Sequence, residues 1–372
     1  MISINIWTIV IALLIFGFLI FIHELGHYLT ARLFRVHIRE FAIGMGPKLF
    51  TKTSKKTGIA YSLRALPIGG FVSMVGDDEE SDDPDAFHKK PVWQRIIITV
   101  AGASMNVLIG VLVMSFLVMS QDMLPSTTIA KFQEPAVTEE IVQEEVPVME
   151  SVAGEKKEPE PVVSTEEFGL RVGDTITKIG PAKVHIANEL VYEVMRRGWE
   201  PLDVTVIRDG ETMVIPQVQF PKFYESGALF GNVDFYVLGE DVNPATVMKH
   251  SYFRAVSTIK MIWESLYDMI TGRYGVETVS GPVGVTEALG EAASEGVEDL
   301  IYLAVVISMN LGIMNLLPFP ALDGGRLLFQ LIELVRRKPV PTEIEGMVHF
   351  AGLVLLMILF VVITFKDIMS LI

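Results

Sequence analysis

Long apolar runs alternate with polar segments along this chain, and four of the runs have the length of a membrane-spanning helix. The expected spans cover residues 7–33, 96–119, 300–317 and 348–365. A bilayer core about 30 Å thick needs about 20 apolar residues in a helix that rises about 1.5 Å per residue. Residues 1–22 lack a basic leader and a small-residue cleavage site, so we expect a retained helix here and not a signal peptide.

Shorter patterns predict β structure and a further helix. Residues 42–50 and 61–72 read as short strands with Gly and Pro turns. Residues 168–218 contain strand, helix and hairpin patterns with a turn at residues 209–210, which predicts a small α+β unit. Residues 244–270 predict an amphipathic helix, which lies either along the membrane surface or on the α+β unit.

These elements predict a polytopic α-helical membrane protein with about four transmembrane helices, a membrane-associated β-hairpin and an α+β domain outside the membrane. The acidic tract at residues 77–85 is expected to be a solvated loop, and residues 134–167, rich in Glu, Pro and Val, to be a flexible insertion. The four transmembrane helices are expected within residues 1–34, 93–120, 300–338 and 339–372. Residues 35–92 form the β segment, residues 121–225 the α+β domain with its insertion, and residues 226–299 an amphipathic linker.

Composition narrows the classes of protein that remain. Half of the residues are hydrophobic and the mean hydropathy is +0.43, which excludes one compact soluble domain. The absence of cysteine excludes disulfides, thiolate metal sites and cysteine nucleophiles. A net charge of −15 without a basic stripe argues against a nucleic-acid partner.

The basic residues that flank the apolar runs predict the orientation. Residues 32–95 are rich in Lys and Arg, and Arg336, Arg337 and Lys338 follow the third run. By the positive-inside rule, the first and third connections are cytoplasmic. Both termini and the large middle region are then extracytoplasmic.

A metal-binding motif, His-Glu-Leu-Gly-His, begins at residue 23 inside the first span. Residues four apart lie on one face of a helix, so His23 and His27 can bind one metal ion. Glu24 can then take a proton from a water on that metal. Two incidental histidines on a surface helix are the alternative, which the cost of polar groups at membrane depth disfavours. His23 lies about 24 Å into a core of about 30 Å, so the site is expected near the cytoplasmic face.

Asp323 is the candidate for a third metal ligand. Catalytic zinc usually takes three protein ligands and leaves one position for water. The third span runs in the same direction as the first, and Asp323 follows it at about the depth of His23 and His27, about 33 Å beyond the start of that span if helical. In the alternative, Asp323 caps a helix near a Gly-Gly turn.

Pro318 and Pro320 interrupt the third span just before Asp323. Non-helical backbone at membrane depth is tolerated where it is buried or lines a cavity. An extended segment here is a candidate for pairing with a substrate strand. Asn315 either hydrogen-bonds the substrate backbone or makes an interhelical contact, and both readings stay open.

Gly69, Gly70 and Phe71 lie in the second predicted strand, which is too apolar for a simple solvated loop. A hairpin that enters the membrane near the site would offer a strand edge to substrate. An ordinary cytosolic hairpin is the other reading of the same residues.

Together, these residues resemble the site-2 protease family of intramembrane zinc metalloproteases, in its bacterial RseP/RasP-type branch. Residues 23–27 match the family's His-Glu-x-x-His motif, and residues 315–324 match its Asn-x-x-Pro-x-Pro-x-Leu-Asp-Gly motif. Residues 69–72 look like its membrane-reentrant hairpin, residues 280–284 like another family segment, and residues 168–218 like its extracytoplasmic PDZ domain.

The resemblance implies Zn2+ bound by His23, His27 and Asp323, with Glu24 as the base. It implies cleavage of single-span membrane proteins, such as anti-sigma factors or remnant signal peptides, after another protease has trimmed them. It also implies a multi-pass protein of the cell membrane.

Two features of the sequence depart from the family pattern. The family often has Ala-Gly-Pro-x-x-Asn in the second span, and Ala103 stands here in place of that proline. One PDZ-like unit is evident, and residues 134–167 fall where its early strands are expected.

Two other classes of function compete with the protease. A non-proteolytic membrane scaffold would use a structural metal and a peptide-binding PDZ-like domain, but a structural site needs no base at Glu24. The hypothesis of a metal transporter has less support, because few other intramembrane carboxylates or histidines are available to pass a metal ion across the membrane.

Overall fold

The structure is a computed structural model that describes residues 6–77, 81–133, 164–225, 228–273 and 279–370. The chain forms two compact units. The first comprises Met1–Leu117, Thr258–Leu266 and Val279–Ile372, and the second comprises Val118–Ser257 and Tyr267–Thr278.

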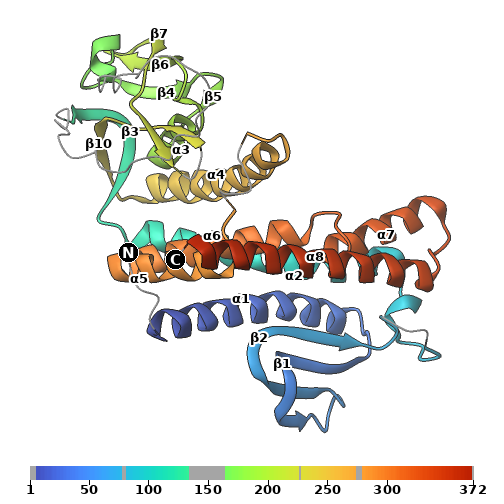
Figure 1. Cartoon of the computed structure of the whole chain (residues 1–372). Helices are drawn as coiled ribbons and strands as arrows, with labels where there is room; N and C mark the ends of the chain where they lie inside the picture. Colours follow the sequence, from blue (N-terminus) through green and yellow to red (C-terminus); the bar gives the residue numbers. More distant parts are fainter. Residues whose placement is uncertain (1–5, 78–80, 134–163, 226–227, 274–278, 371–372) are drawn as a thin grey trace, which may run out of the picture. The chain divides into compact units, whose positions relative to one another are not determined.

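Four of the described helices are long and apolar enough to cross a membrane (Figure 1). They are α1 (Ile6–Leu33), α2 (Val92–Ser120), α6 (Val297–Asn315) and α8 (Thr342–Ser370). The four spans expected from the sequence are therefore confirmed as apolar helices. Most side chains of α8 are exposed, whereas the other three helices bury a larger share of theirs.

A break separates α6 from the short helix α7 (Asp323–Arg336), as the two prolines predict. Residues 316–322 form a tight loop that packs on the first turn of α7. A Cβ added at Gly324 would collide with the carbonyl oxygens of Leu316 and Leu317. The glycine therefore lets this loop fold back directly onto α7.

A further helix, α5 (Pro282–Glu295), contacts α1, α6 and α8 in the first unit. Its N-cap residue, Gly281, has no side chain to cap the helix. Asp367 of α8 supplies the missing acceptor, because its carboxylate accepts a hydrogen bond of 3.0 Å from the Gly284 N–H. The end of α8 is thereby tied to α5.

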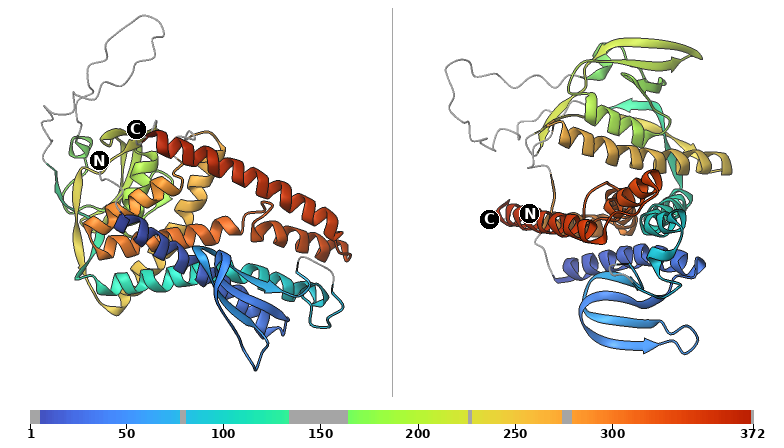
Figure 2. Two further views of the ribbon diagram at one scale, coloured as in Figure 1. Left: turned by 60° about the horizontal axis from the view of Figure 1, so that its bottom comes forward. Right: turned by 90° about the vertical axis from the view of Figure 1, so that its right-hand side faces the viewer.

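The predicted hairpin is formed by β1 (Ile38–Thr53) and β2 (Ala60–Met74), which pair antiparallel and lie against α1 (Figure 2). A 3-10 turn, η1 (Phe87–Lys89), follows. A buried apolar cluster joins α1, the segment after it, the hairpin, the turn and α2: Tyr28, Ala31, Val36, Ile38, Phe41, Ile59, Val72, Met74, Phe87 and Ile98.

The second unit is an α+β fold around an antiparallel sheet whose neighbouring strands are not all consecutive in sequence. The strand order is β10-β3-β4-β6-β7, with β5 paired to β4, and β8 and β9 form a separate hairpin. The strands are β3 (Met123–Phe132), β4 (Thr175–Ile179), β5 (Ala182–Lys183), β6 (Leu202–Arg208), β7 (Glu211–Val218), β8 (Lys222–Glu225), β9 (Ala228–Gly231) and β10 (Phe235–Asp241). A 3-10 turn, η2 (Thr165–Phe168), and the helix α3 (Ala187–Arg197) complete it.

The strand, helix and hairpin expected within residues 168–218 are present as β4, α3 and β6–β7. The sheet extends beyond that stretch, because β3 precedes the expected insertion and β10 follows residue 225. These two strands pair with each other. Residues 134–163, most of the expected insertion, lie outside the described residues.

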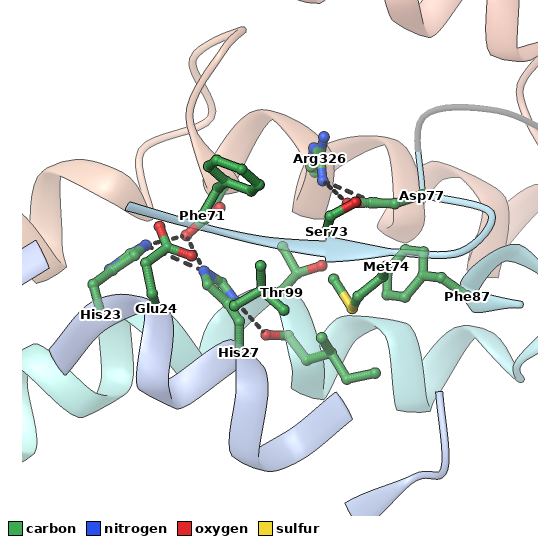
Figure 3. Close-up of a pocket in the computed structure, with 13 residues that line it drawn as sticks. His23, Glu24, His27, Phe71, Ser73, Met74, Asp77, Phe87, Thr99 and Arg326 are labelled. Carbon is green, nitrogen blue, oxygen red and sulfur yellow. Dashed lines mark hydrogen bonds and ion pairs between the residues drawn. The ribbon is translucent and has the colours of Figure 1, made fainter. Parts of the chain in front are cut away.

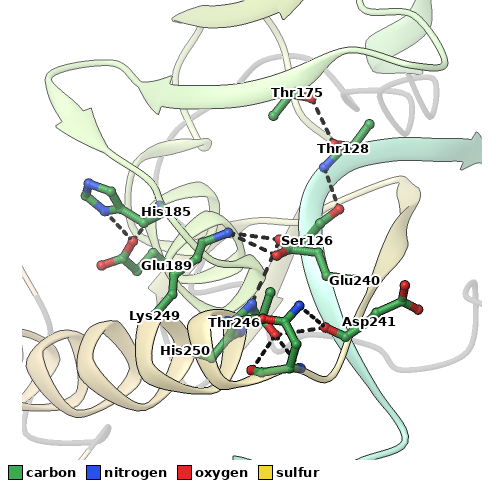
Figure 4. A network of polar contacts seen from close by, with 11 residues as sticks. Ser126, Thr128, Thr175, His185, Glu189, Glu240, Asp241, Thr246, Lys249 and His250 are labelled. Atoms are coloured by element: carbon green, nitrogen blue, oxygen red, sulfur yellow. Dashed lines mark hydrogen bonds and ion pairs between the residues drawn. The ribbon is translucent and has the colours of Figure 1, made fainter.

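The predicted amphipathic helix is α4 (Pro244–Ile270). Asn243 caps it by accepting hydrogen bonds from the N–H groups of Ala245 and Thr246, and Lys249 pairs with Glu240 at 2.9 Å (Figure 4).

Both ends of α4 pack on the α+β unit, which is one of the two placements left open. The ring of Phe253 stacks on His185 with centroids 3.9 Å apart. Asp268 accepts two hydrogen bonds of 2.8 Å from the buried guanidinium of Arg196.

Candidate metal and catalytic site

Two histidines on α1 point toward each other from successive turns. His23 and His27 are both buried, and their Nε2 atoms lie 3.2 Å apart. Their rings are nearly perpendicular, with an interplanar angle of 80°. The four-residue spacing of an α-helix produces this arrangement, as the sequence predicts.

The tautomer of His27 follows from its contact with α2. Its Nδ1 lies 2.8 Å from the carbonyl oxygen of Ile98. A carbonyl can only accept, so Nδ1 carries the proton and donates it. The Nε2 lone pair of His27 is therefore directed at the space shared with His23, which is the orientation of a metal-binding imidazole.

The carboxylate of Asp323 lies at the same point. Its Oδ2 is 3.0 Å from His23 Nε2 and 3.3 Å from His27 Nε2. Asp323 is the first residue of α7, but its side chain does not cap the helix. The structure thus brings together the three residues predicted as metal ligands, and the capping alternative is not observed.

The three atoms have the spacing of a tetrahedral zinc site. Ligand atoms about 2.0–2.1 Å from a tetrahedral ion are about 3.3 Å from one another. In this cluster the separations are 3.0, 3.2 and 3.3 Å. The lone pair of His27 Nε2 faces the lone pairs of a carboxylate oxygen, which is unfavourable unless a cation lies between them. The residues present therefore fit a zinc ion.

Glu24 lies beside this cluster and lines the same cavity of about 410 Å³ (Figure 3). Its carboxylate accepts a hydrogen bond from the backbone of Val72 in β2. The cavity is otherwise lined by residues of β2, of the segment that follows it, and of α2 and α7: Phe71, Val72, Ser73, Met74, Asp77, Phe87, Ile98, Thr99 and Arg326. The hairpin therefore forms one wall of the site.

Glycines allow neighbouring elements to approach the site closely. A Cβ added at Gly102 of α2 would lie 2.8 Å from His23 Nε2 and would collide with His27 Nε2. A Cβ at Gly70 of β2 would lie 3.1 Å from Glu24 Cγ. Sequence reasoning did not identify Gly102 as a site residue, because only the packing of α1 on α2 reveals its position.

The residues predicted to bind substrate are only partly brought to the cavity. Phe71 lines it, and Gly69 and Gly70 precede Phe71 on β2. Among the described residues, the cavity lining does not include Asn315, which ends α6, or Pro318 and Pro320, which lie in the loop before Asp323.

Phe71 is held by a polar network within the hairpin. The Arg64 guanidinium lies 4.7 Å from the Phe71 ring centroid and donates to Glu40 at 3.0 Å. Glu40 also accepts from Lys48 at 2.9 Å and from Ser62. Burial raises the pKa of Glu40, but these donors outweigh it and hold the pKa at about 2. The network fixes one wall of the cavity.

A second polar cavity of about 660 Å³ adjoins the first and shares Asp77, Phe87 and Arg326 with it. The Arg326 guanidinium donates to both carboxylate oxygens of Asp77 at 2.8 Å (Figure 3). This ion pair, which sequence reasoning also missed, stands where the two cavities meet.

Comparisons with known proteins point to one family. A family model described as Peptidase family M50 matches residues 11–359. A Clostridium acetobutylicum protein with a zinc metalloprotease name is 35% identical over 367 residues, covering 97% of each chain. The regulator of sigma-W protease RasP of Bacillus subtilis is 30% identical over 448 residues, covering 98% of this chain and 99% of the relative. The zinc metalloprotease RasP of Geobacillus kaustophilus is 30% identical over 446 residues, covering 97% of each.

Proposed function

The chain belongs to peptidase family M50, that of the site-2 proteases, and is a zinc metalloprotease with several membrane helices; from this premise we propose that it cleaves peptide bonds within the membrane. The observation that carries the proposal is the convergence of His23, His27 and Asp323 on one point beside Glu24. His23 and His27 come from a helix of membrane-spanning length, so peptide hydrolysis here takes place at membrane depth.

His23 and His27 would hold the zinc ion through Nε2, and Asp323 would hold it through a carboxylate oxygen. Zinc bound there supplies a Lewis acid that makes water more acidic and polarises a carbonyl. The Ile98 carbonyl fixes His27 in the tautomer that this role needs.

Glu24 is the general base and then the general acid. Its carboxylate takes a proton from the attacking water and later donates it to the leaving nitrogen of the cleaved peptide. Glu24 follows His23 directly, and the backbone of Val72 holds its carboxylate against the cavity. A purely structural metal site has no use for such a group.

Phe71, with Gly69 and Gly70, forms the surface on which we place the substrate. A peptide bond in an intact helix is shielded, so the substrate must become extended before hydrolysis. An extended chain can pair with a strand edge, and β2 lies beside Glu24. We also assign Asn315, Pro318 and Pro320 to the binding region, because they end α6 or lie in the loop that leads to Asp323.

Flanking charge supports an orientation with both termini and the second unit outside the cytoplasm. The active site then lies near the cytoplasmic face. The second unit acts as a PDZ-like domain on the outer side, where it limits access by substrates that have not been trimmed.

Single-span membrane proteins are the substrate class that we propose, such as anti-sigma factors and remnant signal peptides. The B. subtilis relative is named as a regulator of sigma-W, which supports a role in regulated intramembrane proteolysis.

The test is co-expression of the full chain with candidate single-span proteins, comparing wild type with Glu24→Gln. We expect uncut substrate to accumulate with the variant, while the purified variant keeps its zinc, because glutamine has a similar shape but cannot take the proton. Full cleavage by Glu24→Gln would refute the mechanism. Partner binding that survives zinc removal, without any cleavage by wild type, would favour the scaffold.

A further inference from the structure

One side chain of α8 contacts the backbone just before Asp323. The Ala321 N–H donates a hydrogen bond of 2.9 Å to Nδ1 of His349. Ala321 has a φ of +74°, in the left-handed region that residues with a Cβ rarely adopt. An external acceptor thus holds a disfavoured backbone conformation two residues before a proposed zinc ligand.

Close packing from two helices restrains the same loop. A Cβ added at Gly352 of α8 would lie 2.7 Å from the Pro320 carbonyl oxygen. On the other side, a Cβ added at Gly325 of α7 would lie 2.5 Å from the Phe319 carbonyl oxygen. The loop is therefore held between α7 and α8, and His349 supplies the directional contact.

The surroundings of His349 favour the tautomer that this contact needs. Its Nε2 lies 3.9 Å from a carboxylate oxygen of Glu345, one turn earlier on α8. A carboxylate on that side favours a proton on Nε2, which leaves Nδ1 as an acceptor. The Phe329 ring of α7 packs against the imidazole, with centroids 5.7 Å apart.

We propose that His349 is a positioning residue for the metal site: it fixes Ala321, and through it the direction in which Asp323 enters the ligand cluster. The proposal rests on the proposed role of Asp323 as a zinc ligand. The positioning role would make α8 part of the support of the metal site, although most side chains of α8 are exposed. Groups that orient a metal ligand typically change metal affinity by about 10- to 100-fold when removed.

The experiment compares His349→Phe, which keeps a ring but has no acceptor, with His349→Asn, whose amide oxygen takes the place of Nδ1. Phe350→Ala is the matched control, because Phe350 is its neighbour on α8 and is 69% exposed. Each full-length protein is purified in detergent, and its zinc dissociation constant and the visible spectrum of its cobalt(II)-substituted form are measured. The spectrum reports the geometry of the ligands independently of activity.

We expect His349→Phe to raise the zinc dissociation constant by at least about tenfold and to change the cobalt spectrum. His349→Asn should recover most of both, and Phe350→Ala should match wild type. If the phenylalanine variant does not accumulate, His349→Leu serves in its place. Wild-type values for His349→Phe, or equal losses in the phenylalanine and asparagine variants, would overturn the positioning role.

Asp323→Ala separates this proposal from the function on which it rests. If Asp323→Ala leaves the cobalt spectrum unchanged, the proposed ligand set is wrong, and the positioning role falls with it. If Asp323→Ala changes the spectrum and His349→Phe does not, the zinc site stands and only the role of His349 is refuted.

Discussion

Replacing Gly102 by alanine tests whether the packing of α2 on α1 defines the metal site. The new Cβ would lie 2.8 Å from His23 Nε2 and would collide with His27 Nε2. Carbon and nitrogen atoms that are not bonded prefer a separation of about 3.5 Å, so His23 must move by about 0.7 Å. Zinc–ligand distances tolerate changes of only about 0.2 Å.

The neighbours of Gly102 offer no easy relief, because both imidazoles are buried and the Ile98 carbonyl holds the His27 ring in place. We expect overpacking to destabilise the protein by about 1–3 kcal/mol and zinc affinity to fall by at least about tenfold. Zinc per chain is measured by mass spectrometry after purification, and cleavage is measured by co-expression with a single-span substrate.

Gly346→Ala is the matched control for this substitution. Gly346 also lies within a helix, but nothing lies within 4 Å of its added Cβ, so zinc content and cleavage should stay at wild-type levels. If Gly102→Ala keeps one zinc per chain and cleaves at the wild-type rate, the close approach of α2 to the two histidines is not a feature of the working enzyme.

Two further predictions concern parts that support the site. Because the folded pKa of Glu40 is about 2, below its ordinary value of 4.5, its stabilising effect is present above pH 4.5 and is lost as the pH falls toward 2. Between pH 2 and pH 4.5, the thermal unfolding temperature of Glu40→Gln should vary less with pH than that of wild type. The same pH dependence in both proteins would contradict the network. Asp268→Asn should destabilise the packing of α4 on α3 by about 3 kcal/mol, because it leaves the Arg196 guanidinium buried without its carboxylate. Limited proteolysis of the intact protein would detect this, and wild-type resistance would argue against it.

The parts of the site that depend on local spacing were predictable from the sequence. His23 and His27 share a helix face in any helix that contains them, and the depth of Asp323 follows from two spans expected to run in the same direction. The hairpin strands and α4 were also recognisable, because turn residues and apolar periodicity act over a few residues.

The remaining features depend on contacts between residues far apart in the chain. The Ile98 carbonyl is a backbone atom that no motif marks, and the role of Gly102 appears only when α2 lies against α1. Arg326 and Asp77 are unremarkable charges until the fold pairs them. β10 was missed because its hydrogen-bonding partner, β3, lies on the other side of the expected insertion.

The order of the proposed ligands along the chain has a consequence for biogenesis. During translation, α1 and α2 emerge first, and Asp323 follows only after most of the polypeptide has been made. A nascent or truncated chain thus carries two imidazoles and the glutamate without the carboxylate of the proposed third ligand. Such a fragment is expected to have no proteolytic activity. The order of the residues along the chain therefore delays activity until synthesis is nearly complete.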